Sequence, residues 1–267
     1  MKDTGTRSKC SPAATVVKHA ETAASGCRGE ILAAQNVWSY SLTSLAKGRG
    51  LPSSLDALAD WLESRSPDGR WSGKIYVAST IEWAEGEFLQ SGCSPNYRAG
   101  WWSLTCCKHE MRSGGPMRKR LKHPEDESVF IFTLARQDKQ GRQGLVSVAK
   151  VTEHFDDMAT YADYLRATRD RAFMSSRLTR TRRNDGELGW RFGDCHADRS
   201  GTVGEPHCDH VHYDHDQWKR DSSGEHALLV SDCFLLWRTP QLFARKKLKQ
   251  SRFGHDITPQ RLSQMLH

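Results

Sequence analysis

Two apolar runs joined by a short polar connector constrain the fold of this chain more than any other feature. Residues 128–134 (SVFIFTL) and 145–152 (LVSVAKVT) are rich in the β-branched and aromatic residues that strands prefer. The connector, residues 138–144, is polar and contains two glycines. This combination predicts a β-hairpin in the middle of the chain.

Further β-rich runs surround this hairpin. Residues 74–78 and 100–107 predict short strands, and residues 226–237 predict one longer buried strand. Between them, residues 156–173 place apolar side chains near one helical face and arginines largely on others, which is typical of a surface helix that covers a sheet. The expected fold class is α+β, with a small mixed β-barrel or sheet and covering helices.

The chain ends differ from the middle. Residues 1–28 have no apolar period and are predicted to be a disordered head. Residues 29–72 predict a helical hairpin, with one helix over 29–47 and a second that begins after Pro52 and ends at the turn sequence 67–69. Residues 73–240 are then the main domain, and residues 241–267 a basic tail that ends in a weak helix.

Composition limits the partners. The chain has 267 residues, a formal charge of +7 and a pI near 9.0, which favours a polyanionic partner such as nucleic acid. No apolar run approaches the roughly 20 residues that a membrane span needs, so no membrane partner is expected. The N-terminus does not resemble a secretion signal, so we expect a cytoplasmic protein with reduced cysteines.

Basic residues concentrate in three clusters, at 118–122, 177–183 and 245–252. Each could neutralise phosphates, and each could equally be a solvated cationic loop. No phosphate-binding glycine loop, serine nucleophile elbow or dinucleotide fingerprint occurs, which excludes the commonest enzyme classes that these motifs mark.

The stretch 100–112 combines an apolar run with thiols and cations. Lys108 and Arg112 follow the predicted strand closely, where ligands tend to bind. Cys107 could be a nucleophile activated by its lysine neighbour, or a buried structural thiol.

A second candidate segment, 195–216, is dense in cysteine, histidine and aspartate. Its side chains are of the types that bind zinc, but their spacing matches no known zinc finger, and a soluble loop without metal is the alternative. The metal-ligand candidates are His207, His210, His212 and His215.

Residues 74–240 resemble the family called nucleotide modification associated domain, second type, found near DNA base-modification genes of phages and bacteria. The resemblance rests on ordered blocks, among them KIYVA at 74–78, SLTCCK at 103–108, GLVSVAKVTE at 144–153 and Gly193-Asp194. It departs from the family at His109, where proline is usual, and at Cys195, where asparagine is usual. A weaker likeness to the small barrels of the PUA, ASCH and EVE group implies a pocket for a modified or flipped base.

Three functions follow as hypotheses. The first is recognition of a modified base or its nucleotide in a base-modification system, with nucleotide contacts from Lys108, Arg112, Trp101, Trp102, Trp190 and Lys150. The second is a nucleotide- or base-modifying enzyme, with or without zinc, that uses Cys107, His109, Asp194 and His207. The third is a scaffold whose basic arms bind other base-modification proteins.

Overall fold

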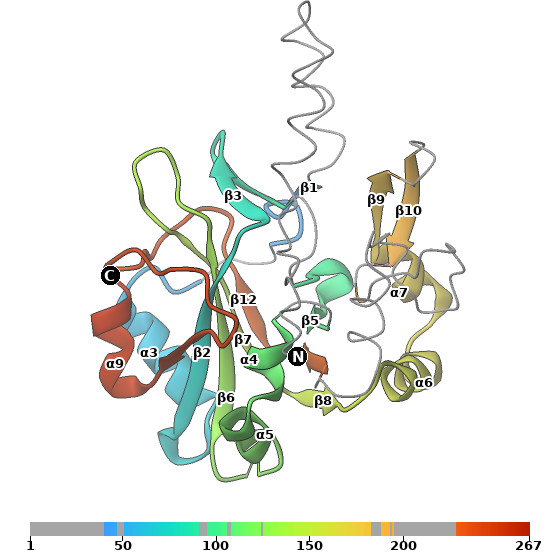
Figure 1. Cartoon of the computed structure of the whole chain (residues 1–267), viewed down its shortest axis with the longest axis horizontal. Helices are drawn as coiled ribbons and strands as arrows, with labels where there is room; N and C mark the ends of the chain where they lie inside the picture. Colours follow the sequence, from blue (N-terminus) through green and yellow to red (C-terminus); the bar gives the residue numbers. More distant parts are fainter. Residues whose placement is uncertain are drawn as a thin grey trace, which may run out of the picture.

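The computed structural model describes residues 40–46, 51–90, 95–105, 108–123, 125–182, 188–192, 194 and 228–267. These residues form an α+β fold around a mixed five-stranded sheet of order β12-β7-β6-β2-β13 (Figure 1). Its strands are β2 (Trp71–Ala78), β6 (Ser128–Ala135), β7 (Leu145–Lys150), β12 (Phe234–Leu236) and β13 (His255–Ile257). Only β2 and β6 are parallel to each other.

The predicted central hairpin is confirmed. Strands β6 and β7 pair antiparallel, and every residue of β6 is buried. The connector is closed by Asp138, whose carboxylate accepts hydrogen bonds from the backbone amides of Gln140 and Arg142, 2.9 and 2.8 Å away. Gly141 adopts a φ of 79°, which a glycine tolerates without strain.

A second, three-stranded sheet has the order β5-β11-β8, from β5 (Trp102–Leu104), β8 (Glu153–Phe155) and β11 (Leu228–Ser231). The prediction of one strand over 226–237 is therefore wrong, because the chain leaves β11 and enters β12 in the central sheet. Between the two strands the Ser231 hydroxyl accepts a hydrogen bond from the Cys233 amide at 3.0 Å, closing a turn that an apolar pattern does not reveal.

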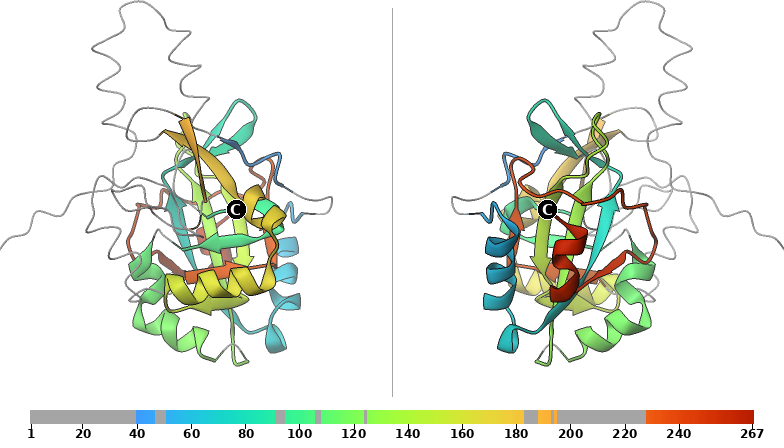
Figure 2. Two further views of the ribbon diagram at one scale, coloured as in Figure 1. Left: turned by 90° about the vertical axis from the view of Figure 1, so that its right-hand side faces the viewer. Right: turned by 90° about the vertical axis from the view of Figure 1, so that its left-hand side faces the viewer.

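Helices cover both sides of the two sheets. Helix α6 (Met158–Thr168) lies on one side, whereas α3 (Leu55–Ser64) and α9 (Pro259–Met265) lie on the other (Figure 2). The predicted helix over 156–173 is confirmed as α6, but it ends at Thr168, and α7 (Arg171–Ser176) follows separately. No helix in the described ranges is both long and apolar enough to cross a membrane.

The expected helical hairpin ahead of the domain is corrected in part. Its second helix exists as α3, whose buried Leu58 and Leu62 belong to the main core, followed by a 3-10 turn η1 (Pro67–Gly69). Its first helix was expected over 29–47, but β1 (Tyr40–Ser41) forms a strand there and pairs with β4 (Glu87–Gln90). Residues 29–39 and the predicted head, 1–28, lie outside the described residues.

The description of residues 241–267 as a basic tail is wrong, although its terminal helix exists. Strand β13 completes one edge of the central sheet, and α9 buries Leu262 and Met265 in the same core as α3. Apolar residues are widely spaced among the cations of this segment, so the charge pattern hides the core positions.

The described strands do not close into a barrel: four separate sheets are formed, including β1-β4-β3 with β3 (Ile81–Ala84). The mixed sheet that the sequence predicts is thus present without the closed barrel. Between β5 and β6 the chain forms two short helices that the sequence analysis did not predict, α4 (His109–Ser113) and α5 (Gly115–Leu121).

Candidate functional site

The corner between β5 and α4 holds the first group of predicted ligand contacts. Lys108 has a left-handed backbone, with φ of 61°, and directly precedes α4. Its ammonium group lies 5.6 Å from the ring centroid of Tyr76 and donates a hydrogen bond to the Ser251 carbonyl at 3.2 Å. Lys108 therefore links β2, α4 and the C-terminal segment, and its side chain is half-buried.

The C-terminal segment, at residues 252–254, packs closely against α4. A Cβ atom at Gly254 would lie 2.7 Å from Met111 Sδ, and Gly254 has a φ of 64°, so this position requires glycine on two counts. Arg252 forms an ion pair with Glu110 at 3.2 Å, and Glu110 also contacts His109 Nε2 at 2.9 Å. His109 is thus engaged by its own neighbour.

Three of the residues predicted to contact nucleotide have buried side chains. Arg112 is 0% exposed and Trp102 is 0% exposed, so neither meets solvent in this conformation. Trp101 is 3% exposed; it stacks on Tyr164 with ring centroids 6.4 Å apart, under the guanidinium group of Arg169.

Lys150, another predicted contact, is half-buried at the end of β7. Its ammonium group donates to the carbonyl of Arg65, the C-cap residue of α3, at 2.6 Å. This bond satisfies a helix-terminal carbonyl and ties α3 to the central sheet.

Asp194 is the centre of a buried polar network rather than a solvent-facing acid or base. Its carboxylate pairs with Arg177 through two hydrogen bonds of 2.8 and 3.1 Å, and both side chains are 0% exposed. The carboxylate also accepts hydrogen bonds from Asn96, Ser103 and Tyr161, and the backbone carbonyl accepts one from Thr105.

The same network fixes Arg177 and Tyr161. Arg177 donates to the carbonyls of Arg98 and Trp101 at 2.7 and 2.8 Å, so its charge is satisfied internally. Burial, followed by the negative charge of Asp194, raises the pKa of the Tyr161 hydroxyl well above its usual value. Asp194 and Arg177 thus bind each other inside the protein, and the expected roles of Asp194 in catalysis and of Arg177 in phosphate binding stay predictions.

Other candidates cannot be placed. Cys107 and the histidines His207, His210, His212 and His215 lie outside the described residues. Trp190 lies in strand β10 (Leu188–Phe192), which pairs with β9 (Leu178–Arg182).

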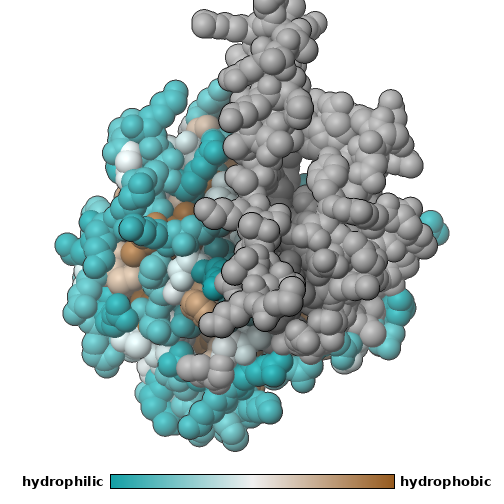
Figure 3. All heavy atoms as spheres, viewed as in Figure 1, coloured by the Kyte–Doolittle hydropathy of each residue, from teal (hydrophilic) through white to brown (hydrophobic). Residues whose placement is uncertain are grey.

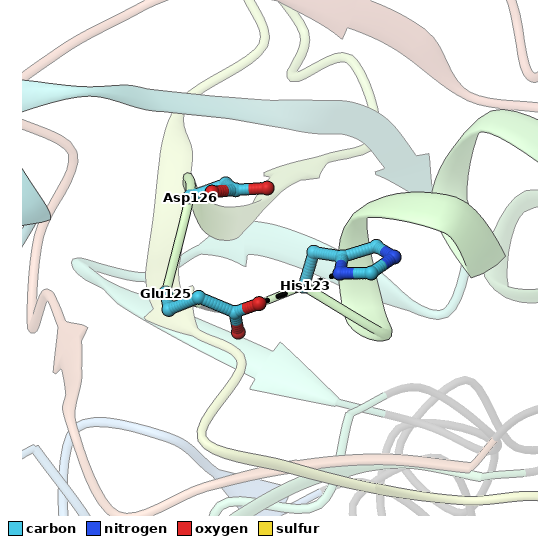
Figure 4. Close-up of side chains that lie close together, drawn as sticks. All are labelled: His123, Glu125 and Asp126. Atoms are coloured by element: carbon cyan, nitrogen blue, oxygen red, sulfur yellow. Dashed lines mark hydrogen bonds and ion pairs between the residues drawn. The ribbon is translucent and has the colours of Figure 1, made fainter.

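One potential ligand group was not anticipated from the sequence. His123, Glu125 and Asp126 each offer a ligand atom within 4.8 Å of the others (Figure 4). All three are exposed and belong to one turn, and His123 Nδ1 already contacts Glu125 at 3.3 Å. A backbone hydrogen bond lowers the pKa of Glu125. Exposed acidic groups commonly lie this close without an ion, so the group carries no argument for a metal.

Exposed lysine and arginine side chains remain the candidate binding residues in the part of the chain that the structure describes. Helix α5 buries Met117 and Leu121 and exposes Arg118, Lys119 and, just after it, Lys122. The 245–252 segment adds a second exposed group, namely Arg245, Lys246, Lys247, Lys249 and Arg252. The described part of the surface in Figure 3 is mostly hydrophilic, with small scattered apolar patches.

The paired apolar positions of α5, four residues apart and close behind a proline, are a signal that could have identified this helix from the sequence. Comparisons with protein-family models, with characterised proteins and with solved structures find no match.

Proposed function

We propose that this protein acts in the cytoplasm as a DNA- or nucleotide-binding component of a DNA base-modification system. The proposal rests on the exposed cations of α5 and of the 245–252 segment, together with the formal charge of +7. Phosphate neutralisation by lysine and arginine supplies much of the affinity in such complexes.

Helix α4 connects these two basic groups, which are more than a hundred residues apart in the sequence. It runs directly into α5 at Gly114, and it holds the 245–252 segment through the Glu110–Arg252 ion pair. The Lys108–Ser251 hydrogen bond adds a second link. Both basic groups therefore adjoin α4, which favours a shared phosphate-binding surface over unrelated solvated loops.

Binding has more support than catalysis. Asp194 is occupied by five side-chain hydrogen bonds and is 0% exposed, and His109 is engaged by Glu110. The same proposal includes recognition of the modified base and a PUA-like fold of the sheet. Base stacking would use aromatic residues other than Trp101 and Trp102, because these pack inside the protein.

The direct test is fluorescence anisotropy with a labelled duplex, measured over a series of salt concentrations. The double variant Lys119→Gln/Lys122→Gln removes two exposed charges, one from α5 and one from the residue that follows it. If both contact phosphate, the slope of log K against log[salt] becomes shallower by about 1.8, at roughly 0.9 for each contact.

Arg70→Gln/Arg261→Gln is the matched control, because it removes the same charge from exposed positions outside both basic groups. This control keeps the wild-type slope if the α5 cations act locally. Equal slopes for both variants would contradict a specific role for α5. Absence of any salt-dependent binding by the wild-type protein would refute the proposed function itself.

A further inference from the structure

Phe253 is the one large apolar residue that is exposed among the side chains that the structure describes. It is 56% exposed, whereas the other large apolar side chains described are buried or half-buried. Phenylalanine is usually buried in folded proteins, but isolated exposed apolar residues also occur on most surfaces. The setting of Phe253 therefore decides whether its exposure serves a function.

The segment that carries Phe253 is fastened to the core. The side chain of Gln143 donates a hydrogen bond to the Leu248 carbonyl at 3.2 Å and accepts one from the Leu248 amide at 2.7 Å. Leu248 is itself buried in the main core. One residue further along, the Lys249 carbonyl lies 2.9 Å from His255 Nε2, at the start of β13. This contact closes the loop 249–255, which contains Phe253.

The backbone is held on both sides of Phe253 within this loop. The Phe253 amide donates a hydrogen bond to Ser251 Oγ at 3.2 Å, which is a turn that serine often forms. The Ser251 carbonyl accepts the hydrogen bond from Lys108, and Gly254 packs against Met111 of α4. The ring of Phe253 is therefore exposed on a backbone that is already ordered, so a ligand that contacts it does not have to order a loop.

Cations accompany the ring in the same loop. The guanidinium carbon of Arg252 lies 5.7 Å from the Phe253 ring centroid, within the range of about 6 Å for a cation–π contact. The ion pair with Glu110, at 3.2 Å, restrains this guanidinium group beside the ring. Lys249 is exposed as well. Proteins bind single-stranded nucleic acid with this combination, because the ring stacks on a base while the cations contact the backbone.

We propose that Phe253 stacks on an unpaired base of single-stranded DNA, with Arg252 and Lys249 contacting the adjacent phosphates. This inference rests on the proposed function and identifies its substrate as a strand with unpaired bases. Inside a duplex, neighbouring base pairs cover both faces of a base, so the ring finds a free face only where a base is unpaired. A duplex therefore engages the cations alone, whereas a single strand engages the cations and the ring.

An anionic membrane surface also attracts cations and an exposed aromatic residue. Binding to such a surface grows with the apolar area that enters the headgroup region. The exposed residues that precede Phe253 in the loop are charged or polar, namely Lys249, Gln250 and Arg252. One ring supplies little apolar area but is enough to stack on one base, so these observations favour nucleic acid.

The test measures fluorescence anisotropy with a labelled single strand and, separately, with the same strand in a duplex. Phe253→Ala should weaken binding of the single strand about 5- to 150-fold, as expected for the loss of one base–aromatic stack, and should leave duplex binding unchanged. Its salt slope should equal that of the wild-type protein, because the ring neutralises no phosphate.

Two further variants separate stacking from general apolar contact. Phe253→Trp keeps an aromatic face and should retain at least the wild-type affinity for the single strand. Phe253→Leu keeps an apolar side chain without that face and should bind the single strand more weakly. Because the side chain is exposed, all three variants should unfold at the wild-type temperature, which shows that any loss of binding is local.

The outcomes distinguish this inference from the proposed function. Wild-type affinity of Phe253→Ala for the single strand, alongside a shallower slope in Lys119→Gln/Lys122→Gln, would overturn the inference and leave the proposed function standing. Equal weakening on single strand and duplex would overturn the assignment to an unpaired base. Binding to vesicles of phosphatidylserine and phosphatidylcholine that is lost in Phe253→Ala, with unchanged affinity for the strand, would assign the ring to a membrane surface instead. No binding of nucleic acid by any form would refute both proposals.

Discussion

The Asn variant of Asp194 is the sharpest test of the buried network. Asp194→Asn keeps the shape of the side chain but removes its charge, and it leaves the guanidinium group of Arg177 buried without a counter-ion. Breaking one partner of a fully buried pair typically costs about 3–5 kcal/mol. For a chain of this size each kcal/mol lowers Tm by about 2–4 °C, so the midpoint should fall by roughly 6–20 °C.

The same substitution at an exposed pair provides the control. Asp163 accepts a hydrogen bond from Arg166 at 2.7 Å, but both side chains are more than half exposed, at 77% and 55%. Such pairs contribute about 0–1 kcal/mol. Urea unfolding followed by circular dichroism should therefore separate Asp194→Asn from Asp163→Asn by at least about 2 kcal/mol. Indistinguishable unfolding curves for the two variants would refute the conclusion that the buried Arg177–Asp194 pair stabilises the folded protein.

Three further predictions follow from the structure. Burial raises the pKa of Tyr161 above that of an unfolded tyrosine, so the stability that its neutral hydroxyl provides is complete below about pH 10 and is lost as pH rises toward the folded pKa. The alkaline decline in the free energy of unfolding should therefore be smaller in Tyr161→Phe than in the wild-type protein. An unchanged decline would contradict this role of Tyr161. Gly254→Ala should destabilise the protein by about 2–4 kcal/mol, since the new Cβ meets Met111. Gly86→Ala, which also has a positive φ but faces open space, should cost only about 1–2 kcal/mol, and equal losses in urea unfolding would disprove the close contact. Burial raises the pKa of the Cys233 thiol, so peptide mapping after iodoacetamide treatment at pH 8 should show slower alkylation of Cys233 in the folded than in the unfolded protein.

The parts of the fold that local patterns determine were predictable. The β6–β7 hairpin, helix α3 and helix α6 follow from apolar spacing and turn residues, which act within a few positions of the chain. The split between β11 and β12 was not predictable, because it depends on a side-chain turn at Ser231 inside an uninterrupted apolar run.

The candidate site was harder to predict, because burial depends on distant segments. Arg112 and Trp102 have the composition of a ligand site, but both side chains are fully buried in the folded protein, which a local sequence pattern does not reveal. Asp194 carries a carboxylate suited to catalysis, and its burial beside Arg177 and Tyr161 depends on the approach of segments distant in the sequence. Most basic residues at 118–122 and 245–252 are exposed, as charged side chains usually are, whereas Arg177 of the third basic cluster is buried.

The salt dependence of duplex binding by the wild-type protein tests the central claim most directly. We predict an affinity that falls steeply with salt, with a log–log slope more negative than about −3, as expected when several phosphates are neutralised. A duplex that carries a modified base recognised by the protein should bind more tightly than its unmodified counterpart at every salt concentration. A flat salt profile, or no binding to either duplex at low salt, would contradict the claim that this basic surface recognises DNA.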